Sequence, residues 1–311
     1  MKKKIKKIII FGGTGFIGEY LARESLRKNF VVSIVSRTKP KLKIKKINYI
    51  LLDVRQNKSF KKKLKNKFFD YVINLSGNIN HSNNRETFST HFTGCKNIAN
   101  YFIKKKIKKF IQIGSCLEYG KIKSPHTEKL SPDYKKLKSS YSIAKLKATN
   151  YLLKLFNRHQ FPVTVLRLYQ IYGPGQKLDR LIPFVINSCL QKKNFFCSDG
   201  VQKKDFLYID DLIKVIFKAM FSNEASGKII NIGQGQPTSI KKIILLINKK
   251  IRYGNPIYGK IKLRKDEAKI LYPNISFAKK ILRFSPKISL PNGLDRTIAF
   301  YSSMLKLRKN T

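Results

Sequence analysis

Residues 8–18 pass from a short apolar run through a glycine turn into an amphipathic stretch, and this pattern constrains the fold more than any other in the chain. Three glycines at this spacing allow a tight turn, close approach of the backbone to a pyrophosphate and close packing of a helix on a strand. The unpaired N–H groups at the start of that helix favour negative charge. The sequence therefore predicts a dinucleotide-binding turn made by Gly12, Thr14, Gly15, Phe16, Ile17 and Gly18.

The first half of the chain alternates apolar runs with amphipathic stretches. This alternation is typical of parallel strands with helices on both faces. Right-handed crossovers then give a doubly wound sheet with ligand sites at the carboxyl ends of its strands. We therefore predict an α/β protein with a Rossmann-type parallel sheet, whose expected strands are 7–11, 31–36, 48–53, 71–75, 110–114 and 163–168. The expected helices between them are 17–28, 59–67, 85–105 and 141–157.

The pattern changes after about residue 169, where prolines and glycines divide the chain into short elements. Helices are expected there at 210–221, 239–249 and 290–306. We therefore predict an NAD(P)-binding domain at 1–169 and a smaller, irregular substrate-binding lobe at 170–311. Because no low-complexity linker separates the two, the boundary is soft and partly interleaved.

Cofactor choice depends on the end of the second expected strand. An acid there bonds the ribose 2′-hydroxyl of NAD, whereas an arginine accommodates the 2′-phosphate of NADP. The chain has Arg37 and no acid at this place, which favours NADP while leaving NAD open. Asp53 and Val54 follow the third expected strand and are placed to meet the adenine. Leu75, which ends the fourth, completes the expected cofactor contacts.

Tyr141 and Lys145 lie four residues apart in an expected helix, so they share one face about a turn from each other. A nearby ammonium stabilises phenolate and lowers the tyrosine pKa from about 10. Such a tyrosine can exchange a proton with a sugar oxygen while hydride moves at the same carbon. Ser115, at the end of the fifth expected strand, could hold that oxygen. The three residues form the predicted catalytic group, with Lys145 also expected to contact the cofactor.

The order of glycine turn, strand-end serine and Tyr-x-x-x-Lys resembles the extended short-chain dehydrogenase/reductase family, in its nucleotide-sugar-modifying NAD-dependent epimerase/dehydratase branch. Four further segments are similar to motifs of that branch: 114–120, 166–175, 204–211 and 231–233. The resemblance covers nearly the whole chain. It implies a nucleotide-diphosphate sugar as substrate, bound in part by Gln170, Lys204 and Arg264. It also places Glu267 with Arg264 at the nucleotide, and His91 beside the active site. For His91, and for His81 in the loop after the fourth expected strand, an ordinary loop or core histidine is an equal alternative.

One departure from the family pattern bears on the reaction. The dehydratases carry an Asp-Glu pair after the catalytic hydroxyl, and Cys116 and Leu117 stand there in this chain. A 4,6-dehydratase is therefore not expected. Arg37 and a likeness to CDP-abequose and CDP-paratose synthases favour an NADPH-dependent reductase of a 4-keto-6-deoxy nucleotide sugar. An NAD-dependent 4-epimerase is a close alternative, and a non-catalytic NADP-binding regulator is a distant one.

The net charge of +49 comes from 66 Lys and Arg residues against 17 Asp and Glu residues. Such a balance invites a nucleic-acid or membrane-surface interpretation. The lysines occur in nearly every segment beside abundant Ile and Asn, which indicates AT-rich codon usage, so no nucleic-acid partner is expected. The four cysteines form no metal-binding pattern. We expect a cytoplasmic protein with no metal site and no membrane span, and the family resemblance implies a homodimer formed through helices 85–105 and 141–157.

Overall fold

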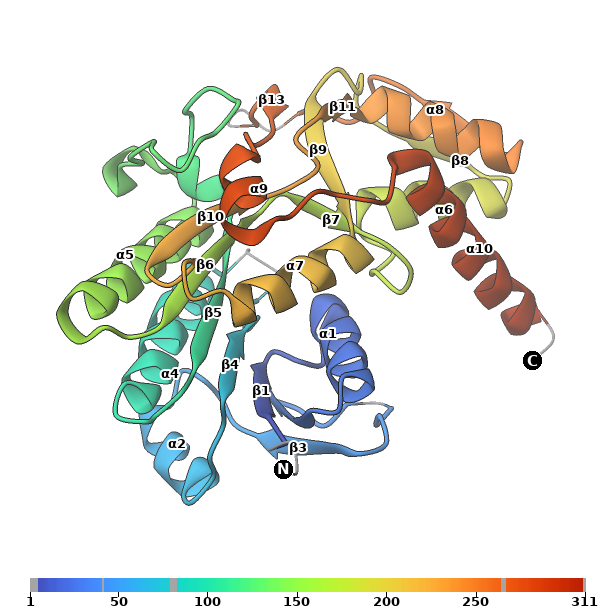
Figure 1. Cartoon of the computed structure of the whole chain (residues 1–311). Coiled ribbons are helices and arrows are strands. Elements are labelled where there is room, and N and C mark those ends of the chain that lie inside the picture. The colour runs from blue at the N-terminus through green and yellow to red at the C-terminus, as the bar shows by residue number, and fades with distance from the viewer. Residues whose placement is uncertain (1–4, 41, 79–82, 264–266, 310–311) are drawn as a thin grey trace.

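The structure is a computed structural model that describes residues 5–40, 42–78, 83–263 and 267–309 (Figure 1). Its main element is a seven-stranded parallel sheet in the order β10-β6-β5-β4-β1-β2-β3. The strands are β1 (Lys7–Phe11), β2 (Val31–Ser36), β3 (Ile47–Leu51), β4 (Tyr71–Asn74), β5 (Lys109–Ser115), β6 (Val163–Leu168) and β10 (Lys228–Ile232). The order reverses between β1 and β4, the switch point at which such sheets bind ligands. The predicted Rossmann-type sheet is confirmed.

Helices cover both faces of this sheet (Figure 1). One face carries α1 (Phe16–Arg27) and α7 (Ile209–Phe221). The other carries α2 (Asn57–Leu64), α4 (Gly94–Phe102) and α5 (Ser140–His159). Before α4 the chain forms α3 (Asn84–Phe88) and a π-helical turn, η1 (Ser89–Thr93), so that one nearly continuous helix replaces the expected 85–105.

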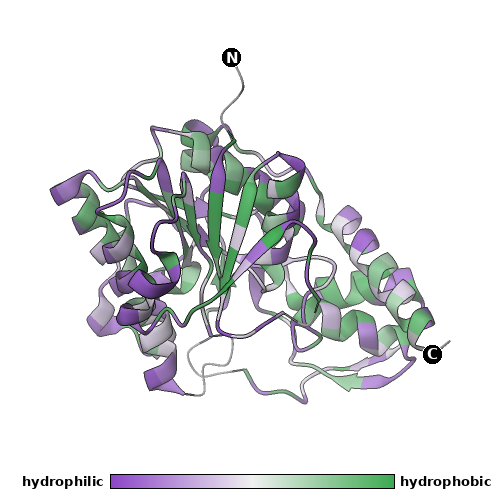
Figure 2. Cartoon of the chain, turned by 90° about the horizontal axis from the view of Figure 1, so that it is seen from below, coloured by the Kyte–Doolittle hydropathy of each residue, from purple (hydrophilic) through white to green (hydrophobic). Residues whose placement is uncertain are grey.

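The apolar strands explain why helices are needed on both faces. In β1, Ile8 and Ile10 belong to the core cluster beneath α1 and α7, whereas Ile9 and Phe11 belong to the cluster beneath α4 and α5. All four side chains are fully buried. Side chains alternate between the two faces of a strand, so a continuous apolar run fits only a sheet that is covered on both sides. Figure 2 shows the hydrophobic character of these central strands.

The described residues of the later part of the chain form two small sheets and four further α-helices. One sheet joins β7 (Gln170–Tyr172), β9 (Lys203–Tyr208), β11 (Pro237–Ser239) and β13 (Ile270–Leu271), and the other joins β8 (Asn194–Phe196) and β12 (Asn255–Ile257). The helices are α6 (Leu181–Leu190), α8 (Ile240–Ile251), α9 (Ser276–Leu282) and α10 (Leu290–Lys309). Most of these elements lie above the carboxyl ends of the large sheet (Figure 1).

The proposed lobes at 1–169 and 170–311 exchange elements. Strand β10 pairs with β6 in the large sheet, and α7 packs on one face of that sheet beside α1. Both follow residue 169, so the chain returns to the first lobe after leaving it.

Within the described ranges, no helix combines the length and apolar character that crossing a membrane requires. The four cysteines, Cys95, Cys116, Cys189 and Cys197, are buried and free.

Candidate active site

The glycine turn after β1 leaves no room for side chains at two positions. Gly12 has a φ of +74°, and a Cβ added to it would lie 2.8 Å from the Leu75 carbonyl oxygen. A Cβ on Gly18 would lie 2.5 Å from the Gly13 Cα atom. Gly15 is the N-cap of α1 and makes no side-chain cap, so the first N–H groups of the helix are left for another acceptor. The turn therefore leaves backbone N–H groups that suit a pyrophosphate, and its binding by Gly12–Gly18 stays a prediction.

The other predicted residues of the turn lie at its rim, where Thr14 is exposed and Phe16 and Ile17 are half-buried. Leu75 faces Gly12 and is also half-buried. Its backbone N–H donates to the Phe11 carbonyl, which extends the pairing of β1 and β4 by one residue toward the turn.

Arg37 follows β2 as predicted, but a carboxylate from a distant segment contacts it. The Arg37 Nη1 atom lies 2.8 Å from Oε1 of Glu86, a residue of α3. The same carboxylate oxygen lies 3.4 Å from Nη1 of Arg55. NADP was favoured because the sequence places no acid at the end of β2. The fold supplies one from 49 residues away.

Asp53 and Val54, expected at the adenine, are held by neighbouring side chains. Arg55 donates to Asp53 from its backbone N–H and from its guanidinium, with a 2.5 Å contact between Nη2 and Oδ2. These hydrogen bonds lower the pKa of Asp53, against the opposing effect of burial. The Val54 carbonyl accepts a hydrogen bond from the Asn97 amide at 3.0 Å. Both residues therefore lie at the carboxyl edge of the sheet in fixed positions.

The predicted catalytic residues come together at the carboxyl end of β5. Ser115 is the last residue of β5, and Tyr141 and Lys145 lie in the first turns of α5. The Ser139 hydroxyl caps α5 by accepting from the Ser142 N–H, which fixes where the helix begins. The Ser115 hydroxyl hydrogen-bonds to the Tyr141 phenol. The Lys145 Nζ atom lies 5.8 Å from the centroid of the Tyr141 ring and donates to the Ile113 carbonyl at 2.7 Å.

The predicted lowering of the Tyr141 pKa is wrong for this arrangement. Burial raises the pKa of Tyr141 to about 12, and the hydrogen bond from Ser115 opposes that rise only in part. Burial also lowers the pKa of Lys145, while the Glu118 carboxylate acts in the opposite direction. For Tyr141, the desolvation of the phenol outweighs the opposing effects of the Ser115 hydrogen bond and of the Arg180 charge.

His91 lies against Tyr141, the predicted catalytic tyrosine. Its ring meets the Tyr141 ring edge-on, with centroids 4.8 Å apart. The residue is buried in the π-helical turn η1, and its Nε2 atom lies 3.3 Å from both the N and the O atoms of Asn78. Single π-helical turns frequently mark functional sites because they redirect one side chain. His81, the other histidine considered, lies outside the described residues.

A buried ion pair contacts the backbone of Ser115, the predicted catalytic serine. Glu118 is fully buried, and its Oε1 atom accepts the Ser115 backbone N–H at 2.8 Å. Its Oε2 atom accepts from Arg167 Nε at 2.9 Å and from the Thr149 hydroxyl at 2.8 Å. Thr149 is one helical turn beyond Lys145, so this carboxylate joins β5, β6 and α5.

The Glu118–Arg167 pair was not predicted from the sequence. One signal was available, because Arg167 interrupts the otherwise apolar run of β6 and a fully buried arginine requires a partner. The arginine also stacks on Tyr119, with Cζ 4.5 Å from the ring centroid. Nothing in the sequence indicated a partner for Glu86, because it lies in a polar helical stretch where a charged side chain needs none.

The predicted substrate residues are only partly brought together. Gln170 begins β7 and is exposed. The Lys204 ammonium donates to the Ala268 carbonyl at 2.8 Å and lies 3.3 Å from Oε1 of Glu267. Arg264 lies outside the described residues. Glu267 therefore stands near the expected site through its contact with Lys204.

The neighbouring Asp205 fixes the turn after β10. Its carboxylate accepts the backbone N–H groups of Gln234, Gly235 and Gln236 at 2.7, 2.6 and 3.1 Å. Burial nevertheless raises the pKa of Asp205 to about 6. The motif at 204–211 therefore also stabilises the turn after β10, in addition to its expected contact with substrate.

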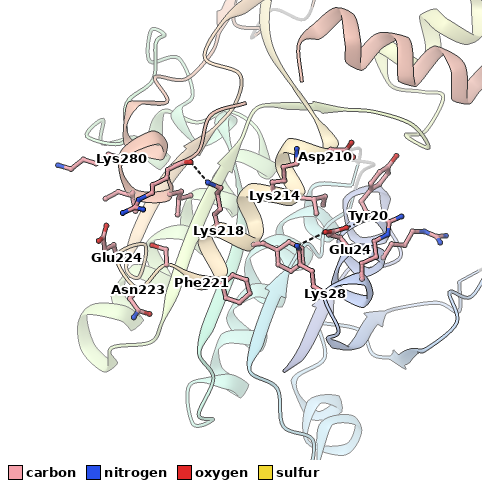
Figure 3. Close-up of a pocket in the computed structure, with 18 residues that line it drawn as sticks. Tyr20, Glu24, Lys28, Asp210, Lys214, Lys218, Phe221, Asn223, Glu224 and Lys280 are labelled. Carbon is pink, nitrogen blue, oxygen red and sulfur yellow. Dashed lines mark hydrogen bonds and ion pairs between the residues drawn. The ribbon is translucent and has the colours of Figure 1, made fainter. Parts of the chain in front are cut away.

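A separate groove of about 1260 Å³ lies between α1, α7 and α9 (Figure 3). None of the predicted cofactor, catalytic or substrate residues lines it. Cationic side chains such as Lys28, Lys214 and Lys218 dominate its rim, and Phe217 and Phe221 lie within it.

The model of the NAD-dependent epimerase/dehydratase family matches residues 8–233, from β1 to the turn after β10. The chain belongs to this family. The match spans the glycine turn, Ser115, Tyr141 and Lys145, and it confirms the resemblance drawn from those residues. Family membership makes the protein a nucleotide-sugar enzyme that depends on a nicotinamide cofactor.

Relatives within the family catalyse different reactions. The UDP-N-acetyl-alpha-D-glucosaminuronate decarboxylase of Bacillus cytotoxicus is 28% identical over 95% of this chain and 98% of its own length. The CDP-abequose synthase of Salmonella muenchen is 29% identical over 43% of this chain and 46% of its own length. The UDP-glucuronic acid 4-epimerase of Bacillus cereus, solved with UDP-glucuronic acid and NAD, superposes with a TM-score of 0.84 at 24% identity, covering 96% of this chain and 99% of that chain. The last likeness shows the fold alone.

Proposed function

We propose that this family member is a 4-epimerase that interconverts two nucleotide-diphosphate sugars and retains NAD through the cycle. The observation that carries the proposal is the contact between Arg37 and Glu86 at the end of β2. A carboxylate at this place accepts a hydrogen bond from a ribose 2′-hydroxyl and repels a 2′-phosphate. NAD suits a reaction without net oxidation, whereas a reductase consumes one reduced cofactor in each turnover.

When bound, NAD would supply the hydride chemistry at C4 of the sugar, which is oxidised and then reduced again with no net change of the cofactor. The Tyr141 phenolate takes the O4 proton in the oxidative half, and the phenol returns it in the reductive half. The Ser115 hydroxyl, which hydrogen-bonds to Tyr141, holds O4 in line. The Lys145 ammonium, 5.8 Å from the centroid of the Tyr141 ring, would favour the phenolate against the burial that raises the pKa of this phenol to about 12. The glycine turn at 12–18 holds the pyrophosphate of the cofactor.

The residues after Ser115 argue against water loss at C5 and C6. Cys116 is buried, and burial raises the pKa of its thiol to about 12, so it carries no charge at neutral pH. Leu117 has no titratable group. Neither residue can supply the acid and base that elimination requires.

A second candidate is the NADPH-dependent reduction of a 4-keto-6-deoxy nucleotide sugar. The similarity to CDP-abequose synthase over part of the chain supports it. The Arg37 argument for this reaction is weakened, because the guanidinium already faces the Glu86 carboxylate at 2.8 Å.

Mass spectrometry of the nucleotide that copurifies with the protein tests the choice. We expect retained NAD, and turnover of UDP-glucose or UDP-glucuronic acid without added cofactor, followed by NMR of the proton at C4. Protein that copurifies without nucleotide, binds NADPH far better than NADH and acts only on a 4-keto sugar would replace the epimerase with the reductase. Release of carbon dioxide from a UDP-uronic acid would identify a decarboxylase instead.

We also propose that the protein works as a homodimer in the cytoplasm. The helical segments expected at the dimer interface, 85–105 and 141–157, lie on one face of the sheet, where α5 packs against α3 and η1. Light scattering coupled to size-exclusion chromatography tests the assembly, and a mass near the 36.0 kDa of one chain would contradict it.

A further inference from the structure

The parallel sheet gathers lysine-rich segments at its amino edge. All seven strands run in one direction, so the residues that precede them lie along the same edge. Neighbouring strands begin at nearly the same height along the sheet, because Lys7 pairs with Val31, Ile8 pairs with Tyr71, and Tyr71 pairs with Lys109. We call this surface the lysine edge, and its cations are Lys6, Lys28, Lys45, Lys46, Lys65, Lys67, Lys104, Lys105, Lys106 and Lys108. Lys6 is half-buried and the others are exposed.

Large apolar side chains are exposed among these lysines. Phe68, just before β4, is 72% exposed, and Phe221, at the end of α7, is 50% exposed. Ile5 and Val31, at the starts of β1 and β2, are 63% and 46% exposed. The Lys6 ammonium lies 4.9 Å from the centroid of the Phe221 ring. Figure 3 shows Phe221 at one end of α7, where the groove between α1 and α7 continues this surface.

Acidic residues do not balance this surface. Asp70 accepts the Lys7 backbone N–H at 2.8 Å and lies 3.2 Å from Lys108 Nζ. Glu24 lies 3.3 Å from Lys28 Nζ. Glu224, just after α7, is a further exposed acid, and the ten lysines outnumber these three acids. The lysine edge therefore carries an excess of positive charge, although lysines occur along the whole chain.

Helix dipoles explain only part of the pattern. The helices between strands end at this edge, and cations near a helix C-terminus are favoured by its dipole. This accounts for lysines after α2 and α4. It does not account for exposed phenylalanines at the same edge, which remain in water unless another surface covers them.

We propose that the lysine edge docks the protein on an anionic lipid surface, with Phe68 and Phe221 entering the headgroup region. Clustered lysines attract acidic headgroups, and apolar side chains among them bury area at the interface. The catalytic residues Ser115 and Tyr141 lie at the opposite edge of the same sheet, so a docked molecule keeps its active site open to solution. The proposal does not depend on which sugar reaction the enzyme catalyses.

Lipid fits this edge better than nucleic acid does. A nucleic acid would neutralise the lysines, but it offers little burial to the aliphatic side chains of Ile5 and Val31. A lipid interface covers both aliphatic and aromatic groups while its phosphates meet the lysines.

The test is cosedimentation of the full chain with vesicles of phosphatidylcholine alone and of phosphatidylcholine mixed with phosphatidylglycerol. We expect binding to the mixed vesicles that weakens with added salt, and little binding to the neutral ones. The double substitution Lys104→Glu/Lys106→Glu should reduce binding at least about tenfold. Phe68→Ser should reduce it severalfold with net charge unchanged.

Matched controls lie on α8, away from this edge. Lys242→Glu/Lys249→Glu makes the same change in net charge at exposed positions, and Leu245→Ser removes an apolar side chain that is 50% exposed. Both should bind vesicles as the wild type does, and circular dichroism checks that all four variants fold. Equal losses in the controls, or no binding to anionic vesicles, would overturn the proposal. So would tighter binding of a single-stranded oligonucleotide than of vesicles, with that binding lost in the Lys104→Glu/Lys106→Glu variant.

Discussion

The Oε2 atom of Glu118 and the Nε atom of Arg167 lie 2.9 Å apart in a part of the core from which solvent is excluded. The same carboxylate accepts the backbone N–H of Ser115, so the position of the proposed catalytic hydroxyl depends on this ion pair. The Thr149 hydroxyl extends the contact to α5, which carries Tyr141 and Lys145. Strand β5 and helix α5 are therefore held in register by one buried acid.

Glu118→Gln should lower both stability and turnover. Loss of the charge leaves Arg167 buried without its counter-ion, and breaking a buried pair typically costs about 3–5 kcal/mol. Urea denaturation measures the free energy of unfolding. At temperatures where the variant is folded, kcat should fall while the affinity for NADH stays close to that of the wild type.

Glu19→Gln is the matched control, because it makes the same change in an exposed pair with Arg23 on α1. Its effect should stay below about 1 kcal/mol. An equally small loss for Glu118→Gln would show that the buried pair does not hold β5 and α5 together.

Tyr141→Phe should abolish turnover while cofactor affinity changes by no more than a few fold. The substitution removes the phenol that exchanges a proton with the sugar oxygen, and it preserves the ring that packs on His91. Steady-state kinetics and NADH titration measure the two effects. Tyr134→Phe, at a position that is 45% exposed, should behave as wild type. Full activity of the Tyr141→Phe variant would exclude the proposed proton path.

Local patterns predicted the elements near the cofactor more accurately than those of the later lobe. The bounds of β1, β2 and β6 match their predictions, because each is a mostly apolar run between polar turns. Helix α6 was missed because Pro183 was treated as a break. The residue is third in the helix, and proline is tolerated in a first turn because the N–H groups there lack intrahelical partners.

Contacts between distant segments could not be predicted from the sequence. Glu86 reaches Arg37, and Arg167 reaches Glu118, each across 49 residues. Both contacts depend on strand order and helix placement, which local periodicity does not encode. Motif spacing was sufficient to predict that Ser115, Tyr141 and Lys145 lie close together, because Ser115 ends a strand and the other two are one helical turn apart.

Glu86→Gln should shift cofactor preference toward NADP. The substitution removes the charge that faces Arg37 and frees the guanidinium for a 2′-phosphate. The ratio of NADPH to NADH affinity should rise about tenfold, which corresponds to about 1.4 kcal/mol. Fluorescence titration of both reduced cofactors measures that ratio. Arg37→Asp should shift preference the other way, toward NAD.

Glu24→Gln changes an acid on the far side of α1 and should leave that ratio unchanged. An unchanged ratio for Glu86→Gln as well would remove Glu86 from cofactor selection. In that case, the contact between Arg37 and Glu86 would no longer favour the epimerase over the reductase.

Lys109 should make stability depend on pH in the alkaline range. The residue begins β5, is 1% exposed, and donates to the Ser222 carbonyl at 2.7 Å. Burial lowers its pKa from 10.5 to about 8. Between these values the unfolded chain holds a proton that the folded chain has released, so raising the pH favours folding. The free energy of unfolding of the wild type should rise relative to Lys109→Met, by at most about 1.4 kcal/mol per pH unit.

Denaturant titrations of both proteins between pH 7 and about 10.5 measure this difference, and ionisation of the tyrosines cancels in the subtraction. Lys108→Met, next to it in sequence but 57% exposed, should show no such slope. A constant difference between wild type and Lys109→Met across this range would mean that the buried amine keeps an ordinary pKa. In that case the carbonyl of Ser222 and the hydroxyl of Ser226 would compensate fully for its lost hydration.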